Sequence, residues 1–302
     1  MHNIQFVNHP DILAVSRGVM SSPQENLSLF NKALKERREK YPSYKPSQRG
    51  KEVATEIEEK GYAKLEQAIN HNIIDSLNDR VTEVLNDPNH EFNQAKVSES
   101  EHCNKVMYLQ CYQPMLTSSL VRGLAFDDLI LDIAGAYIGC KPALGTCNLR
   151  RSYVNNLNEG GTQIYHVDAN SPRFLKFFLY LNDVDKEGGP FCYVEGSHKK
   201  KFFIDGHHFN VQYSWPRELI EAIYGQEKVK LLTAKKGDLL VADTNGWHRG
   251  TKPTKKNRTM LTLNYVCHHE EHNSEKDFKF PKEEFDKMSQ HQKDICDLMK
   301  LV

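Results

Sequence analysis

Residues 174–198, FLKFFLYLNDVDKEGGPFCYVEGSH, contain the two apolar runs that decide the fold. The first run extends from Phe174 to Leu181 and the second from Phe191 to Val194, with Gly188-Gly189-Pro190 between them. Short apolar runs separated by turn residues are typical of antiparallel β-structure. The stretch therefore predicts two strands of a β-barrel or β-sandwich.

The same pattern continues on both sides of this stretch. Further strands are expected where a short apolar run lies between turn residues: Ala143 to Val154, Val229 to Leu232, Leu239 to Asp243 and Thr259 to Val266. The strand that begins at Gly237 is expected to close at Gly246-Trp247-His248-Arg249-Gly250. This spacing favours an antiparallel barrel or sandwich.

The flanking segments predict helices instead, because their apolar residues recur every three to four positions. The expected helices cover residues 27–40, 73–85, 120–138 and 282–301. Gly139 is expected to end the third of them. A Pro-containing linker is expected over residues 41–48 and a short strand over residues 59–65. The fold class is therefore mainly β with flanking helices.

Composition excludes several classes of protein. The 302 residues include 40 Lys plus Arg and 40 Asp plus Glu, so the formal net charge is zero. This balance argues against a nucleic-acid-binding protein or a protein that coats an anionic membrane. Hydrophobic residues make up 39% of the chain, which is enough for a sizeable core.

Cysteine usage and the apolar runs predict a cytoplasmic location. The seven cysteines are odd in number, scattered, and never in a Cys-x-x-Cys pair, which fits a reducing compartment. The first 20 residues lack the pattern of a signal peptide, and the run Phe177 to Leu181 is too short to span a bilayer.

Three metal-ligating side chains stand out within the predicted β region. His166 and Asp168 point to the same face if their backbone is extended, because side chains alternate along a strand. His248 lies eighty residues after Asp168, where it can meet them across a barrel. Two His and one carboxylate form the facial triad of non-heme Fe(II) oxygenases, which leaves coordination positions open.

Arg258 supplies a fourth element of the pattern. A 2-oxo acid occupies two open positions of the metal and leaves one for O2, and its far carboxylate needs a cation of fixed geometry. Arg258 lies ten residues after His248, and a guanidinium pairs with both oxygens of a carboxylate. The order of these residues is more specific than any one of them.

With these residues in place, the sequence resembles the phytanoyl-CoA dioxygenase family of Fe(II)/2-oxoglutarate-dependent oxygenases. The resemblance covers roughly residues 55–270, and the following segments carry it: Tyr165-His166-Val167-Asp168, Leu181-Asn182-Asp183-Val184, Gly188-Gly189-Pro190, Val194-Glu195-Gly196-Ser197-His198-Lys199, Gly237-Asp238-Leu239-Leu240, Trp247-His248-Arg249-Gly250 and Arg258. It implies a double-stranded β-helix core, also called a jelly-roll or cupin-like fold, with flanking helices.

The resemblance also implies site residues. By the match, His166, Asp168 and His248 bind Fe(II), and Arg258 binds 2-oxoglutarate. Polar residues before the His-x-Asp motif are further candidates for contact with 2-oxoglutarate: Arg150, Ser152, Tyr153 and Gln163. Gly250 departs from the family pattern, because a hydroxyl residue is common there. The hydrogen bond that this hydroxyl residue would make to 2-oxoglutarate is then either absent or supplied by Thr251 or Thr262.

The implied reaction is the O2-dependent oxidative decarboxylation of 2-oxoglutarate to succinate and CO2, coupled to hydroxylation of an unactivated C–H bond. Related halogenases replace the carboxylate ligand by a small residue, so the presence of Asp168 favours hydroxylation. The expected partner is a small-molecule substrate, without nucleic acid or membrane.

Two other functions fit parts of the sequence. His268-His269-Glu270-Glu271-His272 matches the His-x-x-Glu-His pattern of a zinc hydrolase, with His268, Glu271 and His272 as its residues, but the pattern needs a helix. A β-barrel that binds a metal or ligand without catalysis is the other alternative. The basic run Lys199-Lys200-Lys201 is either a solvated loop or a site for an anionic substrate.

Three segments are expected along the chain. Residues 1–54 form an N-terminal helical extension and linker, residues 55–270 the dioxygenase domain with its double-stranded β-helix, and residues 271–302 a C-terminal helical tail packed on the same domain.

Overall fold

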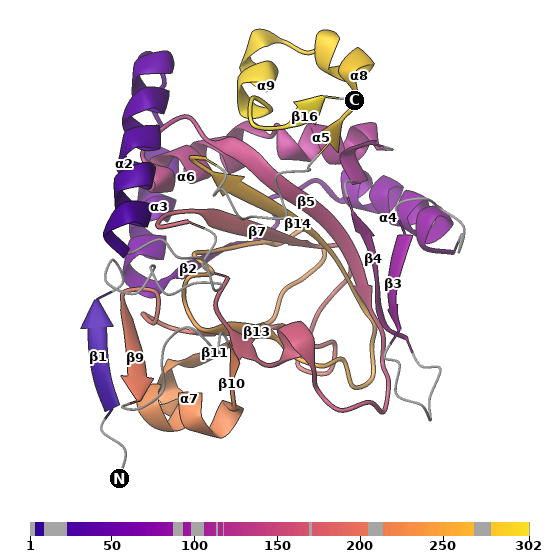
Figure 1. Ribbon diagram of the computed structural model, residues 1–302. Helices are drawn as coiled ribbons and strands as arrows, with labels where there is room; N and C mark the ends of the chain where they lie inside the picture. Colours follow the sequence, from indigo (N-terminus) through magenta and orange to yellow (C-terminus); the bar gives the residue numbers. More distant parts are fainter. Residues whose placement is uncertain are drawn as a thin grey trace.

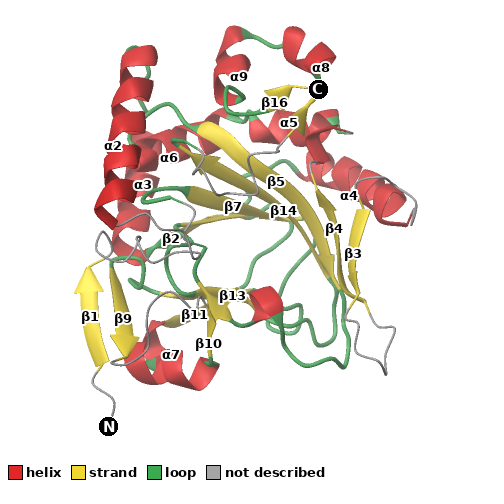
Figure 2. Ribbon diagram, viewed as in Figure 1, coloured by secondary structure: helices red, strands yellow, loops and turns green. Residues whose placement is uncertain are grey.

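Two antiparallel β-sheets lie across the middle of the molecule, and most helices cover one face of the larger sheet (Figure 1, Figure 2). The structure is a computed structural model that describes residues 4–8, 23–86, 93–97, 106–112, 114–116, 118–168, 171–204, 214–268 and 279–301. The expected double-stranded β-helix class, mainly β with flanking helices, is confirmed.

The larger sheet has seven strands. In spatial order they are β2 (Tyr62–Leu65), β12 (Leu239–Ala242), β7 (Leu175–Tyr180), β14 (Arg258–Val266), β5 (Ala143–Ser152), β4 (Val106–Tyr112) and β3 (Asn93–Val97). Every neighbouring pair is antiparallel.

The smaller sheet has five strands. In spatial order they are β10 (Ser214–Trp215), β6 (Tyr165–His166), β13 (His248–Gly250), β8 (Phe191–Val194) and β11 (Val229–Leu232). Two short pairs lie outside the two sheets: β1 (Ile4–Asn8) with β9 (Lys200–Ile204), and β15 (Lys279–Phe280) with β16 (Lys300–Leu301).

Helices form the outer layer in the part of the chain that the structure describes. The α-helices are α2 (Pro23–Lys40), α3 (Gln48–Lys60), α4 (His71–Asn86), α5 (Ser119–Ala125), α6 (Asp128–Ile138), α7 (Arg217–Tyr224), α8 (Lys282–Asp286) and α9 (Gln290–Ile295). Short 3₁₀ helices occur at Pro114–Leu116, Gly161–Gln163 and Gln226–Lys228.

Alternation along β7 explains how one strand serves two layers. Leu175, Phe177 and Leu179 belong to the core between the larger sheet and the helices. Phe178 and Tyr180 belong to a second core between the two sheets. Because successive side chains of a strand point to opposite faces, Lys176 lies on the side of Phe178, toward the interior of the barrel.

Several expected elements differ in extent from the structure; the expected helix over 282–301, for example, contains the short helices α8 and α9 and the strand β16. Residues 41–47 connect α2 to α3, where the linker is expected, and Ser47 caps α3, which extends across the expected boundary at residue 54. The expected helix over 120–138 is two helices, since Asp127 caps α6 by accepting from the Leu129 and Ile130 amides. Gly139 ends α6 with a φ of 91°, as expected.

The expected strand over residues 237–250 is also divided in two. The chain turns at Asp243, where the Gly246 amide donates to the Asp243 carbonyl at 3.0 Å. As a result β12 lies in the larger sheet and β13 in the smaller one. This turn delivers His248 to the opposite side of the barrel from β12.

Ion pairs join the helix α2 and the segment between α6 and β5 to the C-terminal tail. Arg37 Nη1 lies 2.9 Å from Asp297 Oδ1, Lys40 Nζ lies 2.9 Å from Asp297 Oδ2, and Lys141 Nζ lies 2.6 Å from Asp294 Oδ2. These five residues are called the terminal clamp below. The tail also contributes buried apolar side chains to the core beneath the larger sheet: Phe280, Ile295 and Met299.

Two further findings concern the helices and the cysteines. No helix in the described ranges is long and apolar enough to cross a membrane. Six cysteines lie in those ranges, and each of them is a buried free thiol: Cys111, Cys140, Cys147, Cys192, Cys267 and Cys296.

Candidate metal and co-substrate site

The two histidines of the expected triad face each other across neighbouring strands. His166 on β6 and His248 on β13 are paired residues of the antiparallel ladder. Their ring centroids are 4.3 Å apart. The pairing of β6 with β13 therefore brings together two imidazoles that are 82 residues apart in the sequence.

Each imidazole is held by a backbone carbonyl two residues before it. His166 Nδ1 lies 2.8 Å from the Ile164 carbonyl oxygen, and His248 Nδ1 lies 2.8 Å from the Gly246 carbonyl oxygen. A carbonyl only accepts, so each Nδ1 carries the proton and each Nε2 offers a lone pair in the neutral ring. Burial, together with the charge of His248, lowers the pKa of His166 to about 4, which keeps its ring neutral near pH 7.

Asp168 completes the cluster. Its backbone amide donates to the Thr244 carbonyl at 3.0 Å, which fixes the chain after β6. Asp168 Oδ2 lies 3.4 Å from His248 Nε2, and Oδ1 lies 3.9 Å from His166 Nε2. Burial would raise the pKa of this carboxyl, but Lys176 and the two imidazoles hold it well below its usual value.

The donor set fits a divalent transition metal. One ligand atom from each of His166, Asp168 and His248 lies within 4.8 Å of the others. Two imidazole lone pairs and a carboxylate that converge in this way repel one another unless a cation lies between them. Two His and one carboxylate with open positions are typical of non-heme Fe(II) sites.

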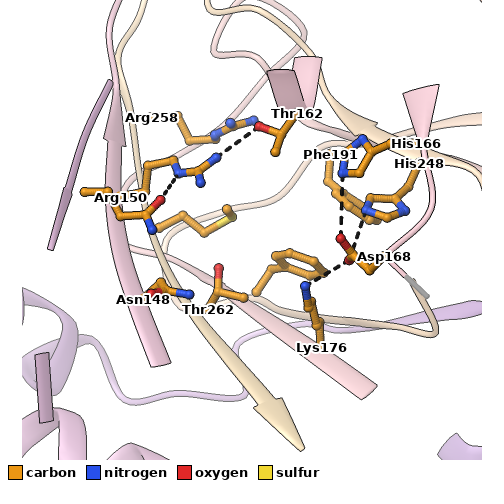
Figure 3. Close-up of a pocket in the computed structure, with 14 residues that line it drawn as sticks. Asn148, Arg150, Thr162, His166, Asp168, Lys176, Phe191, His248, Arg258 and Thr262 are labelled. Atoms are coloured by element: carbon orange, nitrogen blue, oxygen red, sulfur yellow. Dashed lines mark hydrogen bonds and ion pairs between the residues drawn. The ribbon is translucent and has the colours of Figure 1, made fainter. Parts of the chain in front are cut away.

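A cavity of about 120 Å³ opens beside the cluster, between the two sheets (Figure 3). Side chains and one glycine from both sheets line it: Gln110, Asn148, Arg150, Thr162, His166, Asp168, Lys176, Phe178, Phe191, His248, Gly250, Arg258, Met260 and Thr262. Arg258 lies in the same cavity as the three ligands, as the sequence predicts.

Arg258 is a buried cation, only 6% exposed. Its Nη2 donates to Ser152 Oγ at 3.3 Å and its Nη1 donates to the Gly189 carbonyl. Burial lowers the pKa of Arg258, and the charge of Arg150 adds to this effect. No carboxylate among the described residues pairs with Arg258, so its charge is available to an anionic ligand.

Gly250 leaves space for this guanidinium. A Cβ atom at Gly250 would lie 3.0 Å from Arg258 Nη2, which is closer than an ordinary contact. Of the two candidates for the missing hydroxyl contact, Thr262 lines the cavity. Thr251 instead donates through Oγ1 to the Pro190 carbonyl at 2.7 Å.

The other polar candidates are divided between the cavity and its surroundings. Arg150 lines the cavity and donates through Nε to Gln110 Oε1 at 2.7 Å. Tyr153 follows the end of β5, and neither it nor Gln163 is among the lining residues. Gln163 Oε1 accepts from the Gly160 amide at 3.3 Å, so its side chain caps a short turn.

Sequence reasoning missed Lys176, Gln110 and Asn148, which also line the cavity. The signal for Lys176 was present, since a lysine interrupts the apolar run Phe174 to Leu181 at a position two before Phe178. No such signal marks Gln110 and Asn148 in the sequence, because the face of the sheet on which their side chains lie depends on how β4 pairs with β5.

The alternative zinc motif lies mostly outside the described residues. Glu271 and His272 belong to residues 269–278, which the structure does not describe. His268 follows the end of β14, and its ring lies 6.0 Å from that of Phe30 on α2.

Comparisons with known proteins agree with this architecture. Residues 57–260 match the family model described as phytanoyl-CoA dioxygenase (PhyH). No curated protein matches the chain at a significant level.

Several solved structures share the fold. EctD from S. alaskensis with bound Fe is 17% identical, with 89% of this chain and 86% of that chain covered and a TM-score of 0.61. The epimerase SnoN in complex with Fe3+, alpha ketoglutarate and nogalamycin RO is 16% identical, with coverages of 72% and 83% and a TM-score of 0.54. The carbocyclase SnoK from nogalamycin biosynthesis is 17% identical, with coverages of 74% and 87% and a TM-score of 0.53.

Proposed function

Because the chain belongs to the phytanoyl-CoA dioxygenase family, a family of Fe(II)/2-oxoglutarate-dependent oxygenases, we propose that it hydroxylates a C–H bond of a small organic molecule in the cavity between its sheets. The observation that carries the proposal is the convergence of three ligand atoms within 4.8 Å beside the buried Arg258.

In this proposal His166, Asp168 and His248 bind Fe(II). The carbonyls of Ile164 and Gly246 fix both imidazoles in the tautomer that a metal requires. Asp168 contributes the charge that an ion of +2 needs from its protein ligands, because neutral histidines contribute none. Three protein ligands leave the remaining positions of an octahedral ion open.

Arg258 binds the far carboxylate of 2-oxoglutarate. Its guanidinium is already held by Ser152 and by the Gly189 carbonyl, so little side-chain freedom is lost when the co-substrate binds. Ser152 contacts Arg258, and in this way it positions the guanidinium. The contacts of Arg258 and Ser152 are the basis for the co-substrate site, and no such contact supports Tyr153 or Gln163.

The bound metal, 2-oxoglutarate and O2 supply the oxidation, which yields succinate, CO2 and a hydroxylated product. The chain's part is to position these reactants and to exclude water. Phe178, Phe191 and Met260 form the apolar part of the cavity wall and limit access of water to the metal ligands.

Succinate formation tests this function. We expect the protein to convert 2-oxoglutarate to succinate slowly in the presence of Fe(II) and O2, and His248→Ala to lose this conversion. His291→Ala, at an exposed position of α9, is the matched control and should behave as the parent. Succinate release that persists in His248→Ala, or is absent from the parent, would contradict the proposal.

The proposed location is the cytoplasm. Six buried free thiols are consistent with a reducing compartment. Fractionation of cells with an antibody to the protein tests this point, and recovery of the protein from an oxidising compartment would contradict it.

A further inference from the structure

The cavity contains a lysine for which the proposed reaction gives no role. Lys176 projects from β7 toward Asp168, and Figure 3 shows it on a different side of the cavity from Arg258. Its side chain is 16% exposed. A mostly buried ammonium is costly unless an anion lies beside it, so its surroundings determine what it does.

Asp168 is the anion that faces Lys176. Lys176 Nζ lies 2.9 Å from Asp168 Oδ2, and among the described residues Lys176 forms an ion pair with Asp168 alone. Asp168 is also the one carboxylate of the triad. In the metal-bound protein this carboxylate is shared between the metal and Lys176. Asp168 then neutralises less of the positive charge of the lysine.

A charge balance of the proposed complex leaves the lysine in excess. Asp168, a divalent metal ion, the dianion of 2-oxoglutarate and the Arg258 guanidinium together carry no net charge when both histidines are neutral. Two further cations of the lining add positive charge to this neutral set: Lys176, and Arg150, which donates to Gln110 Oε1 and Thr162 Oγ1. A further anion in the cavity offsets this excess at low cost, whereas a neutral or cationic ligand does not.

Part of the remaining wall is polar, alongside the apolar contribution of Phe178, Phe191 and Met260. Gln110, Asn148 and Thr262 present polar side chains to the same space. A ligand with hydrogen-bonding groups suits these side chains.

We propose that Lys176 binds a carboxylate of the primary substrate, which is therefore a carboxylic acid. This inference rests on the proposed function, because it takes the metal and 2-oxoglutarate to occupy the sites assigned above. The ion pair places the substrate beside Asp168, so the C–H bonds near its carboxylate lie next to the metal ligands. Lys176 is in this way a specificity-determining residue.

Acetate is the minimal probe of this site, and acetamide is a neutral analogue of nearly the same shape. The protein is loaded anaerobically with Fe(II) and 2-oxoglutarate and titrated with each compound at constant ionic strength. The readout is the change in the visible charge-transfer band of the chelated 2-oxo acid. We expect saturable binding of acetate, no comparable binding of acetamide, and affinity for acetate at least about tenfold lower in Lys176→Met.

Two further variants complete the design. Lys176→Arg keeps the positive charge and should retain acetate binding, which separates loss of charge from loss of fold. Lys255→Met removes an exposed lysine that pairs with Glu187, and it should match the parent.

The outcomes distinguish this inference from the proposed function. Acetate that binds equally to the parent and to Lys176→Met is ligating the metal directly, and this result would overturn the inference. A Lys176→Met protein that binds Fe(II) but has lost affinity for 2-oxoglutarate would assign the lysine to the co-substrate, and would also overturn it. If the parent develops no band, the proposed function fails first, and the inference fails with it.

Discussion

The terminal clamp and the cavity both bring charged side chains into partly buried positions, but they match those charges differently. In the clamp, Arg37 and Lys40 face Asp297, and Lys141 faces Asp294. In the cavity, Arg258 has no carboxylate partner among the described residues, and Lys176 shares Asp168 with two histidines.

The difference separates a structural cluster from a functional one. In the clamp each cation faces a carboxylate, and the pairs join α2 and Lys141 to the C-terminal tail. In the proposed function, ligands complete the cavity: a metal for the three ligand atoms, and an anion for Arg258. Mutations in the clamp should therefore alter stability, and mutations in the cavity should alter binding.

The largest effect is expected from Asp168→Ala. This change removes the only carboxylate of the triad, so Fe(II) binding and succinate formation should fall at least about a thousandfold, or ~4 kcal/mol. Turnover with saturating Fe(II) is the measurement. Turnover within tenfold of the parent would mean that the cavity does not depend on its carboxylate.

A smaller effect is expected from Arg258→Gln. Loss of the guanidinium should raise the KM for 2-oxoglutarate about a hundredfold, or ~2.7 kcal/mol, with little change in Fe(II) affinity. Arg151→Gln is the matched control. Arg151 precedes Ser152 on β5 and points to the opposite face of the strand, where its Nε donates to Thr259 Oγ1 at 3.0 Å. An equal rise in KM in both variants would remove the distinction between the two arginines.

Asp297→Asn should break the clamp without changing the cavity. It leaves Arg37 buried without its carboxylate, and we expect a loss of ~2–3 kcal/mol of unfolding free energy, less than for a fully buried pair because Asp297 is partly exposed. Chemical denaturation gives this value, and a 2-oxoglutarate titration gives the comparison. A stability equal to that of the parent, or a raised KM, would show that the two clusters are not separate.

The smallest effect is expected from Gly250→Ala. The added Cβ would lie 3.0 Å from Arg258 Nη2, and the guanidinium has to shift by a few tenths of an ångström. The KM for 2-oxoglutarate should rise about threefold, or ~0.7 kcal/mol, while Fe(II) affinity is unchanged. An unchanged KM would indicate that the position of Arg258 is not critical for the co-substrate.

Much of the fold was predictable because its strands carry local signals. The apolar runs from Leu175 to Tyr180 and from Phe191 to Val194 lie between turn residues, and both are strands. The short strands β6 and β13 have two and three residues, too few for any periodicity, and their pairing arises from tertiary contacts. The apolar periodicity did not predict the break between α5 and α6, because a polar residue at position 127 also fits the pattern of one continuous helix.

The candidate site was predictable where residue type and order carry the chemistry. His166, Asp168, His248 and Arg258 were expected from their order, and the structure brings them to one cavity. The enzyme class, an iron- and 2-oxoglutarate-dependent oxygenase, is confirmed by the family match. The polar wall was less predictable, because strand register decides which side chains point into the cavity. Arg150, Thr262 and Lys176 line it, whereas Tyr153 and Gln163 do not.

The most direct test of the cavity as an iron and 2-oxoglutarate site is an anaerobic titration of the metal-free protein, first with Fe(II) and then with 2-oxoglutarate. The readout is the visible charge-transfer band of a 2-oxo acid chelated to Fe(II). We expect a saturable band in the parent and in Asp297→Asn, and its loss in Asp168→Ala. A band of equal strength in Asp168→Ala, or no band in the parent, would contradict the assignment of the cavity.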